Sequence, residues 1–159
     1  MKKVKLGDIT EIITGPFGSQ LHMSDYTDEG IPVIMPYNIT DRQVNTDGIA
    51  RISENDFKRL QRYSTQKNDI IFARRGDVEK HAFIADNEKL LCGTGCLRVR
   101  IINADVYPVY LSFYLTNTKT KRWLTTHAVG SNMPNLNTGI LSDVPVELPD
   151  YDLSEICIG

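Results

Sequence analysis

Two patterns of apolar and polar positions occur along this chain, and they predict different elements. Short continuous or alternating apolar runs predict β-strands, and these runs occupy residues 9–14, 33–35, 49–52, 70–73, 82–85 and 97–102. Apolar positions three or four residues apart predict helices, and such segments begin at Ser53, Pro108 and Thr120. Ser53 is expected to cap its helix, with Asp56 three residues further on. The mixture predicts an α+β fold, with a twisted, mainly antiparallel sheet and a few packed helices.

The segment from residue 130 to residue 149 has two halves that differ in polarity and in the structure they favour. Its first half, Gly-Ser-Asn-Met-Pro-Asn-Leu-Asn-Thr-Gly, is polar and rich in residues that favour turns. Its second half, Ile140 to Leu148, contains β-forming residues and is followed by Pro149, which predicts a last strand. The segment therefore predicts a polar loop that leads into a closing strand. Such a loop either contacts a ligand or simply connects two elements.

The composition is that of one globular domain. The chain has 159 residues, of which 41% are hydrophobic and 24% are charged, and this length is enough to bury a core. No apolar run is long enough to span a bilayer, and no signal-peptide core follows the early lysines. Three cysteines fit a reducing, cytoplasmic location better than a disulfide scaffold. Cys92 and Cys96 are expected to be ordinary strand residues, because no second pair of ligands completes a metal site.

The net charge of −2 does not by itself indicate a DNA-binding protein. The charge is unevenly distributed, however. Residues 141–159 contain five acidic residues and no basic one, so they contribute −5 and leave +3 for the other 140 residues. Two segments, 51–75 and 98–122, are rich in lysine and arginine. These segments either form one surface that faces phosphates or carry scattered, solvated charge.

Motifs of several enzyme classes are absent from the chain. It contains neither the glycine-rich loop nor the Asn/Asp-Pro-Pro-Tyr/Phe motif of an adenine methyltransferase, and neither a phosphate-binding Gly-x-x-x-x-Gly-Lys-Ser/Thr loop nor a Gly-x-Ser-x-Gly elbow. His22, His81 and His127 are isolated, so we expect them to be surface or contact residues rather than metal ligands. We therefore expect neither catalysis nor a metal site in this chain.

Four glycine-containing motifs occur in order along the chain. They are Leu-Gly-Asp-Ile at 6–9 with Gly-Pro-Phe-Gly-Ser at 15–19; Gly-Ile-Pro-Val-Ile at 30–34 with Asn-Ile at 38–39; Asp-Ile-Ile-Phe-Ala-Arg-Arg-Gly at 69–76 with Cys-Gly-Thr-Gly-Cys-Leu-Arg at 92–98; and the segment 130–149. In this order they resemble the target recognition domain of the DNA-specificity subunit of Type I restriction–modification systems. Each motif alone is weakly specific, but the resemblance spans nearly the whole chain.

The resemblance implies a function for residues 1–149. It implies a domain that reads one half of a bipartite site in double-stranded DNA, in the major groove, and that has no catalytic activity and no cofactor. It also implies partners: methyltransferase (M) subunits, which use S-adenosylmethionine, and a translocating restriction (R) subunit, which uses ATP and Mg²⁺. No membrane is implied. Residues 150–159 resemble the start of the family's spacer helix, and we expect this short tail to be insufficient to set the spacing of two half-sites.

Three polar stretches and one predicted helix carry the candidate DNA contacts. Arginine can bind guanine O6 and N7 or a phosphate, and asparagine can pair with adenine. The candidates are Ser19, Gln20, Arg74, Arg75, Lys80, His81, Lys121, Arg122, Ser131, Asn132, Asn135 and Asn137. Alternatives remain open for each group: ion pairs with Asp77 or Glu79, a simple β-turn at residues 15–20, and a solvated helix face.

Two other functions fit parts of the same pattern. The first is a regulatory or anti-restriction protein that uses this fold to bind the methyltransferase. The second, more distant, is a small nuclease, because Asp77, Glu79 and Lys80 loosely resemble a nuclease's acidic and lysine residues. DNA affinity distinguishes the first from a DNA reader, and DNA that stays intact with magnesium would argue against the second.

Overall fold

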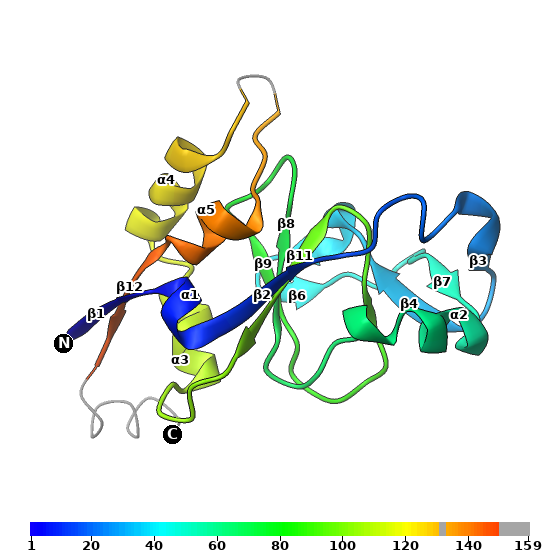
Figure 1. Ribbon diagram of the computed structural model, residues 1–159, viewed down its shortest axis with the longest axis horizontal. Helices are drawn as coiled ribbons and strands as arrows, with labels where there is room; N and C mark the ends of the chain where they lie inside the picture. Colours follow the sequence, from blue (N-terminus) through cyan, green and yellow to red (C-terminus); the bar gives the residue numbers. More distant parts are fainter. Residues whose placement is uncertain (131–132, 150–159) are drawn as a thin grey trace.

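The computed structural model describes residues 1–130 and 133–149, and its central feature is a four-stranded antiparallel sheet (Figure 1). In spatial order its strands are β2 (Thr10–Thr14), β11 (Cys96–Ile101), β8 (Ile70–Ala73) and β9 (His81–Phe83). Cys96 pairs with Ala73, and Leu97 pairs with Thr14. Because neighbouring strands run in opposite directions, β2 and β8 end where β11 and β9 begin. We call this edge of the central sheet the loop end.

A second sheet and two short ribbons complete the β-structure. The second sheet has the order β10 (Leu91–Cys92), β4 (Ile31–Ile34), β7 (Arg51–Ile52) and β3 (Tyr26–Thr27). β10 runs parallel to β4, and the other neighbours are antiparallel. One ribbon joins β1 (Lys2–Lys5) to β12 (Pro145–Leu148), and the other joins β5 (Ile39–Thr40) to β6 (Gln43–Val44).

The helices form two groups on either side of the central sheet (Figure 1). One group contains α1 (Leu6–Ile9), α3 (Pro108–Tyr114), α4 (Thr118–His127) and α5 (Thr138–Ser142). On the other side α2 (Glu54–Arg59) lies beside the second sheet. Short 3-10 turns occupy Met23–Asp25, Pro36–Asn38 and Gln61–Tyr63.

The central strand β8 is buried on both faces, which explains its continuous apolar sequence. Ile70 and Phe72 belong to a core cluster that also contains Leu111 of α3. Ile71 and Ala73 point to the opposite face and belong to a second cluster. Successive side chains of a strand alternate between faces, so a strand that is covered on both sides needs apolar residues at every position. β8 therefore anchors the loop that leaves the sheet after Ala73.

The α+β fold predicted from the sequence is confirmed, with one local correction. The predicted strands correspond to β2, β4, β7, β8, β9 and β11, and the predicted helices correspond to α2, α3 and α4. The Ser53 hydroxyl accepts a hydrogen bond from the backbone N–H of Asp56, as expected. The prediction of one strand from Ile140 to Leu148 was wrong, because α5 occupies the first residues and only Pro145–Leu148 is extended. The Asn137 side chain caps α5 by accepting from the N–H of Ile140, which favours a helix there.

Two other expectations concern the cysteines and the end of the chain. Cys92 and Cys96 are free and buried in strands, and burial raises the pKa of Cys92 to about 12. Among the described residues, no helix combines the length and the apolar character needed to cross a membrane. The predicted spacer-helix segment, residues 150–159, lies outside the described residues.

Candidate nucleic-acid interface

The loop between β8 and β9 carries the first group of predicted contact residues. It leaves the sheet at the loop end, where the backbone N–H of Arg74 donates to Gly95 O at 2.7 Å. Gly76 has φ of 80°, a left-handed conformation that glycine adopts without strain. Arg74 is half-buried and Arg75 is exposed. Neither guanidinium group has a hydrogen-bonding or ionic partner within the part of the chain that the structure describes. Both positive charges are therefore available to a ligand.

A hairpin formed by the second predicted stretch contacts this loop directly. Val129 and Asn135 exchange two backbone hydrogen bonds, of 2.9 and 2.8 Å. Asn135 also forms a β-bridge with Arg75, and Gly76 N donates to Pro134 O at 3.1 Å. The structure thus brings Asn135 next to Arg74 and Arg75, although it lies about 60 residues after them in the sequence. Ser131 and Asn132, which were predicted as contacts, lie outside the described residues.

The two predicted asparagines of this stretch differ in their side-chain contacts. The Asn135 side chain is half-buried, and its Nδ2 donates to Met133 O at 3.1 Å. Among the described residues, no hydrogen bond engages its side-chain oxygen, which can therefore accept one from a ligand. The Asn137 Oδ1 instead accepts from Ile140 N at 2.8 Å and caps α5. Asn137 thus has a structural role that the sequence interpretation did not assign to it.

The third predicted stretch starts at the loop end but is held by its own hydrogen bonds. Gly15 N donates to Cys96 O at 2.8 Å. The Gln20 side-chain oxygen accepts from Phe17 N at 3.0 Å and from the Tyr63 hydroxyl at 3.2 Å. These contacts fit the β-turn alternative for Gln20. Ser19 is exposed and remains a candidate contact.

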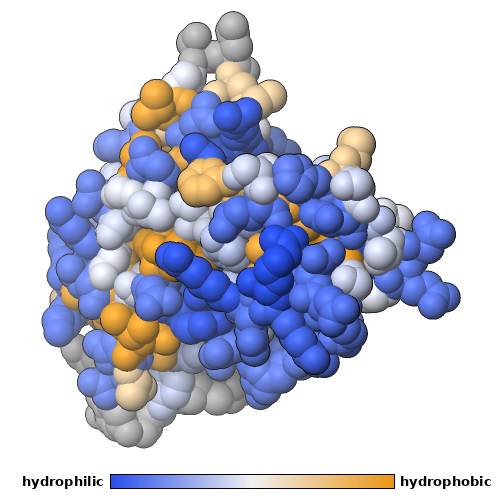
Figure 2. All heavy atoms as spheres, turned by 45° about the vertical axis from the view of Figure 1, so that its right-hand side comes forward, coloured by the Kyte–Doolittle hydropathy of each residue, from blue (hydrophilic) through white to orange (hydrophobic). Residues whose placement is uncertain are grey.

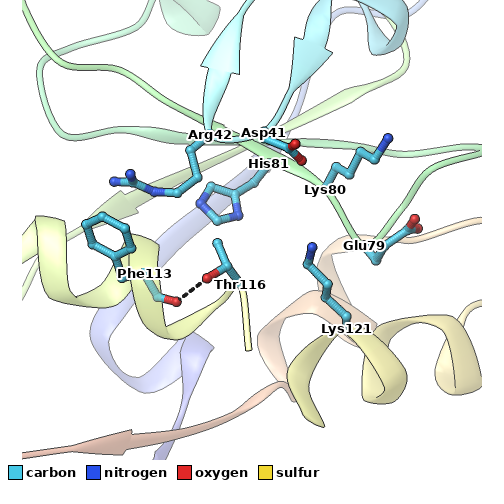
Figure 3. A pocket seen from close by; sticks show the side chains of 8 residues that line it. All are labelled: Asp41, Arg42, Glu79, Lys80, His81, Phe113, Thr116 and Lys121. Atoms are coloured by element: carbon cyan, nitrogen blue, oxygen red, sulfur yellow. Dashed lines mark hydrogen bonds between the residues drawn. The ribbon is translucent and has the colours of Figure 1, made fainter. Parts of the chain in front are cut away.

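A cleft of about 320 Å³ lies next to the β8–β9 loop and brings together three more predicted residues (Figure 3). It is lined by Asp41, Arg42, Glu79, Lys80, His81, Phe113, Thr116 and Lys121. Figure 3 shows Lys121 pointing from α4 toward His81, with Arg42 and Phe113 on the other side of the imidazole ring. Lys80 forms an exposed ion pair with Asp77, with 3.6 Å between Nζ and Oδ2. That ion pair was one of the alternatives that the sequence left open.

His81 is a buried residue, so its prediction as a surface residue was wrong, whereas its contact with DNA stays a prediction. It is only 2% exposed, and its Nε2 lies 2.8 Å from Ser112 Oγ. Burial, reinforced by the positive charges of Arg42 and Lys121, lowers the pKa of His81 to about 4. The imidazole is therefore neutral near pH 7 and adds no charge to the cleft. Its burial follows from its position as the first residue of β9, paired with Phe72.

Helix α4 presents the last pair of predicted basic residues. Its N-cap, Asn117, accepts from Thr120 N at 2.7 Å, which fixes the start of the helix after α3. Leu124 is buried against the core, whereas Arg122 is exposed and Lys121 is half-buried at the cleft. The two basic side chains therefore have different surroundings, and only Lys121 lines the cleft.

The two basic segments do not place all their charges on one phosphate-facing surface. Two of their arginines bind acceptors inside the protein. Arg98 is 4% exposed, and its Nη1 donates to the carbonyl oxygens of Arg62 and Ser64, both at 2.7 Å. Arg100 forms an ion pair with buried Asp69, with 2.8 Å between Nη2 and Oδ2. Both guanidinium groups thus direct donors to acceptors of the protein, although the buried Nε of Arg98 has no partner among the described residues.

The chemistry of the interface is that of recognition by polar and basic groups. No cluster of three potential metal-ligating residues occurs in residues 1–130 and 133–149. Figure 2 shows that hydrophilic side chains cover most of one face of the molecule, with apolar areas confined to small, separate patches. Arg42 and Phe113 were missed by sequence reasoning. A turn containing Asp-Arg between two apolar segments was the only available signal for Arg42.

Comparison with solved structures identifies the same fold in larger proteins. The HsdS subunit from Thermoanaerobacter tengcongensis is 18% identical, with a TM-score of 0.72 over 99% of this chain and 35% of that one. A chain from a study of complex assembly and conformational transition of the Type I restriction–modification system is 17% identical, with a TM-score of 0.71 over 99% and 36%. The Type I S subunit from M. genitalium is 15% identical, with a TM-score of 0.60 over 91% and 34%. This chain thus spans about a third of each.

The sequence itself matches one family model over almost its whole length. No curated protein sequence matches the chain at a significant level. The model that describes the Type I restriction modification DNA specificity domain matches residues 1–153, which include all the described loops of the candidate interface. This chain belongs to the family of Type I restriction–modification DNA specificity domains.

Proposed function

We propose that this domain binds double-stranded DNA sequence-specifically and reads one half of a bipartite site. The observation that carries this proposal is the backbone pairing of two polar segments at the loop end. The Arg75–Asn135 bridge and the Gly76–Pro134 hydrogen bond hold the β8–β9 loop against Pro134 and Asn135. This pairing holds the backbones of Arg74, Arg75 and Asn135 in one place on a rigid sheet.

The chemistry of these groups suits the edges of DNA bases. A guanidinium group can donate two hydrogen bonds to guanine O6 and N7, and an asparagine amide can pair with adenine N6 and N7. Exposed lysines and arginines such as Arg122 would bind phosphates, which positions the protein without selecting a sequence. In this proposal, residues at the loop end contact the edges of the bases, and residues of α4 contact the phosphates of the DNA backbone.

The proposed partners of the domain are the other subunits of a Type I system, and they are inferred from the family. The chain spans about a third of the similar S subunits, so assembly with other subunits is proposed here from the family alone. We infer that the domain is non-catalytic and positions methyltransferase and restriction subunits at its DNA site. S-adenosylmethionine, ATP and Mg²⁺ would be bound by those subunits.

Titration of the 159-residue chain with duplex DNA at low salt tests the proposal. We expect micromolar or weaker affinity, because one half-site offers few phosphates. Selection from randomised duplexes should then return one short half-site. Absence of binding at about 100 μM protein, above the usual non-specific range, would overturn the proposal.

The same experiment distinguishes the alternatives. Tight binding to a methyltransferase subunit without any affinity for DNA would support a regulatory, anti-restriction role. Cleavage of the duplex after incubation with Mg²⁺ would indicate a nuclease. We expect the DNA to remain intact.

A further inference from the structure

Arg42 has an unusual backbone conformation for a residue with a side chain. It lies in the two-residue turn between β5 and β6, where Thr40 pairs with Gln43, and its φ is 60°. This left-handed conformation is uncommon outside glycine and costs free energy. It is held by hydrogen bonds to β9: Arg42 N donates to His81 O at 3.1 Å, and Phe83 N donates to Arg42 O at 3.2 Å. The fold therefore keeps Arg42 at a fixed place beside the cleft.

The Arg42 side chain is fixed as firmly as its backbone. Its Nε donates to Ser112 Oγ at 2.9 Å, and Ser112 is itself in contact with buried His81. The guanidinium carbon lies 3.7 Å from the centroid of the Phe113 ring, a cation–π contact. Phe113 is 56% exposed, so this contact lies at the surface. Figure 3 shows the guanidinium group over the Phe113 ring.

The ends of this guanidinium group have no protein acceptor among the described residues. Arg42 Nη1 and Nη2 form no hydrogen bond, and no carboxylate lies within ion-pairing distance, although Asp41 is adjacent in the chain. In contrast, Arg98 and Arg100 direct their Nη atoms to carbonyl or carboxylate oxygens of the protein. A guanidinium group whose rotamer is already fixed loses little further entropy when it binds a ligand.

The charges around Arg42 favour an electron-rich ligand. The cations of the cleft are Arg42, Lys80 and Lys121, and the acids are Asp41 and Glu79. Lys80 is paired with Asp77, and His81 is neutral. Within residues 1–130 and 133–149, Arg42 and Lys121 form no ion pair, and they lie on two sides of the imidazole (Figure 3). Glu79 and Lys80 belong to the β8–β9 loop that presents Arg74 and Arg75, and they line the same cleft as Arg42.

We propose that Arg42, held by Phe113 and Ser112, is a DNA-contacting residue whose two Nη atoms bind a pair of acceptor atoms. The acceptors are either two phosphate oxygens or guanine O6 and N7, which share the geometry that a guanidinium group recognises. This inference rests on the proposed DNA-binding function and adds to it a contact residue from outside the loops predicted from sequence.

The test compares variants of the 159-residue chain in binding to duplex DNA. Arg42→Gln removes the charge, and Arg42→Lys keeps the charge but loses the paired donors. Phe113→Leu removes the aromatic surface that orients the guanidinium group. Lys67→Gln is the matched control, because it removes one exposed positive charge near the start of β8, at the opposite end of the central sheet. Thermal unfolding of each variant reports the folded fraction.

We expect Arg42→Gln to weaken binding by about five- to a hundredfold, the range for a lost paired contact. Arg42→Lys should recover only part of the affinity, Phe113→Leu should weaken binding by a smaller factor, and Lys67→Gln should change it less than twofold. A base contact predicts that one position of the selected half-site becomes degenerate in Arg42→Gln. A phosphate contact predicts an unchanged selection and a smaller salt dependence.

Each contrary result has a distinct meaning. Wild-type DNA binding with equal affinity for Arg42→Gln and Lys67→Gln would overturn this inference and leave the proposed function standing. If Arg42→Gln does not fold, the other two variants provide the test. Full DNA affinity in folded Arg42→Lys and folded Phe113→Leu would then overturn this inference and leave the proposed function standing. Absence of DNA binding by the wild-type chain would overturn the proposed function together with this inference.

Discussion

Arginine residues of this chain have opposite roles, and burial with local acceptors decides between them. Arg98 is buried and donates to two carbonyl oxygens, whereas Arg75 is exposed and has no protein acceptor among the described residues. A buried guanidinium group needs protein acceptors for its charge, because desolvation of an unpaired charge is costly. The identity of the residue therefore does not reveal its role.

We predict that Arg75→Ala weakens DNA binding without unfolding the domain. Its exposed side chain has no described partner, so the unfolding free energy should change by less than about 0.5 kcal/mol. Loss of a paired base contact should cost about 1–3 kcal/mol of binding. Fluorescence titration and thermal unfolding measure the two effects. A large fall in stability with unchanged affinity per folded molecule would make Arg75 structural.

Arg98→Met should produce the opposite result. Removing this side chain takes away the Arg98 donor of the Arg62 carbonyl oxygen and leaves the Ser64 carbonyl oxygen with only the longer, 3.3 Å hydrogen bond from Arg100 Nη2. We expect a loss of about 2–4 kcal/mol of unfolding free energy and unchanged DNA affinity per folded molecule. Chemical denaturation with a parallel DNA titration measures both. Reduced affinity in a fully stable variant would show that Arg98 acts on DNA.

The lowered pKa of buried His81 predicts that the unfolding free energy of the domain depends on pH. The pKa of His81 is lowered from 6.5 to about 4 in the folded state, so between these values the unfolded chain binds more protons. Stability should fall as pH decreases through this window, by about 2 kcal/mol from pH 7 to pH 5. Urea denaturation at the two pH values measures it. His81→Gln should show a smaller difference, and an equal difference would contradict the assignment.

At the scale of elements, α5 shows how a cap can decide the structure of an ambiguous segment. Its residues, Thr138–Ser142, have β-branched and small side chains that suit a strand as well as a helix. Asn137 satisfies an N–H of the first turn, and Leu141 is buried against the core. The prediction rested on the β-forming residues that follow and did not consider Asn137 as a cap.

Asn137→Ala should therefore lower stability rather than specificity. Loss of the hydrogen bond to Ile140 N should cost about 1 kcal/mol, and DNA affinity per folded molecule should stay the same. Asn137→Asp preserves the capping acceptor and is the matched control for stability. Denaturation of both variants and DNA titration provide the measurement. Weaker DNA binding by a stable Asn137→Ala variant would restore this residue as a contact.

At the scale of the whole molecule, internal use of basic residues limits the charge available to DNA. The chain has 18 lysines and arginines against 20 acidic residues. Arg59 is paired with Asp25 and Asp56, and Arg98 and Arg100 serve the interior. The basic residues assigned here to the loop end, the cleft and α4 that form no ion pair among the described residues are Arg42, Arg74, Arg75, Lys121 and Arg122, and they can neutralise only a few phosphates.

We therefore predict a modest salt dependence of DNA binding. About three to five neutralised phosphates would give a slope of about −3 to −5 for the logarithm of the association constant against the logarithm of the salt concentration. Titrations between about 50 and 200 mM salt measure this slope. A slope near zero would remove phosphate contacts from the interface, and a slope near −10 would require many basic residues outside those assigned here.

The sequence by itself determined the fold class, most of its elements and the family. These properties depend on short-range patterns: the apolar run at Ile70–Ala73, the cap at Ser53, and four motifs in order. Such patterns can be recognised in a sequence because strands, helices and turns each impose a local period or a local backbone preference.

Only the tertiary structure decided which residues share a surface. The bridge between Arg75 and Asn135, the burial of His81 and the contact of Arg42 with Phe113 each join segments far apart in the chain. Sheet order and helix packing set these distances, and they arise from burial of the whole core rather than from any local spacing. The same physical reason separates the arginines that face the interior from those that remain exposed.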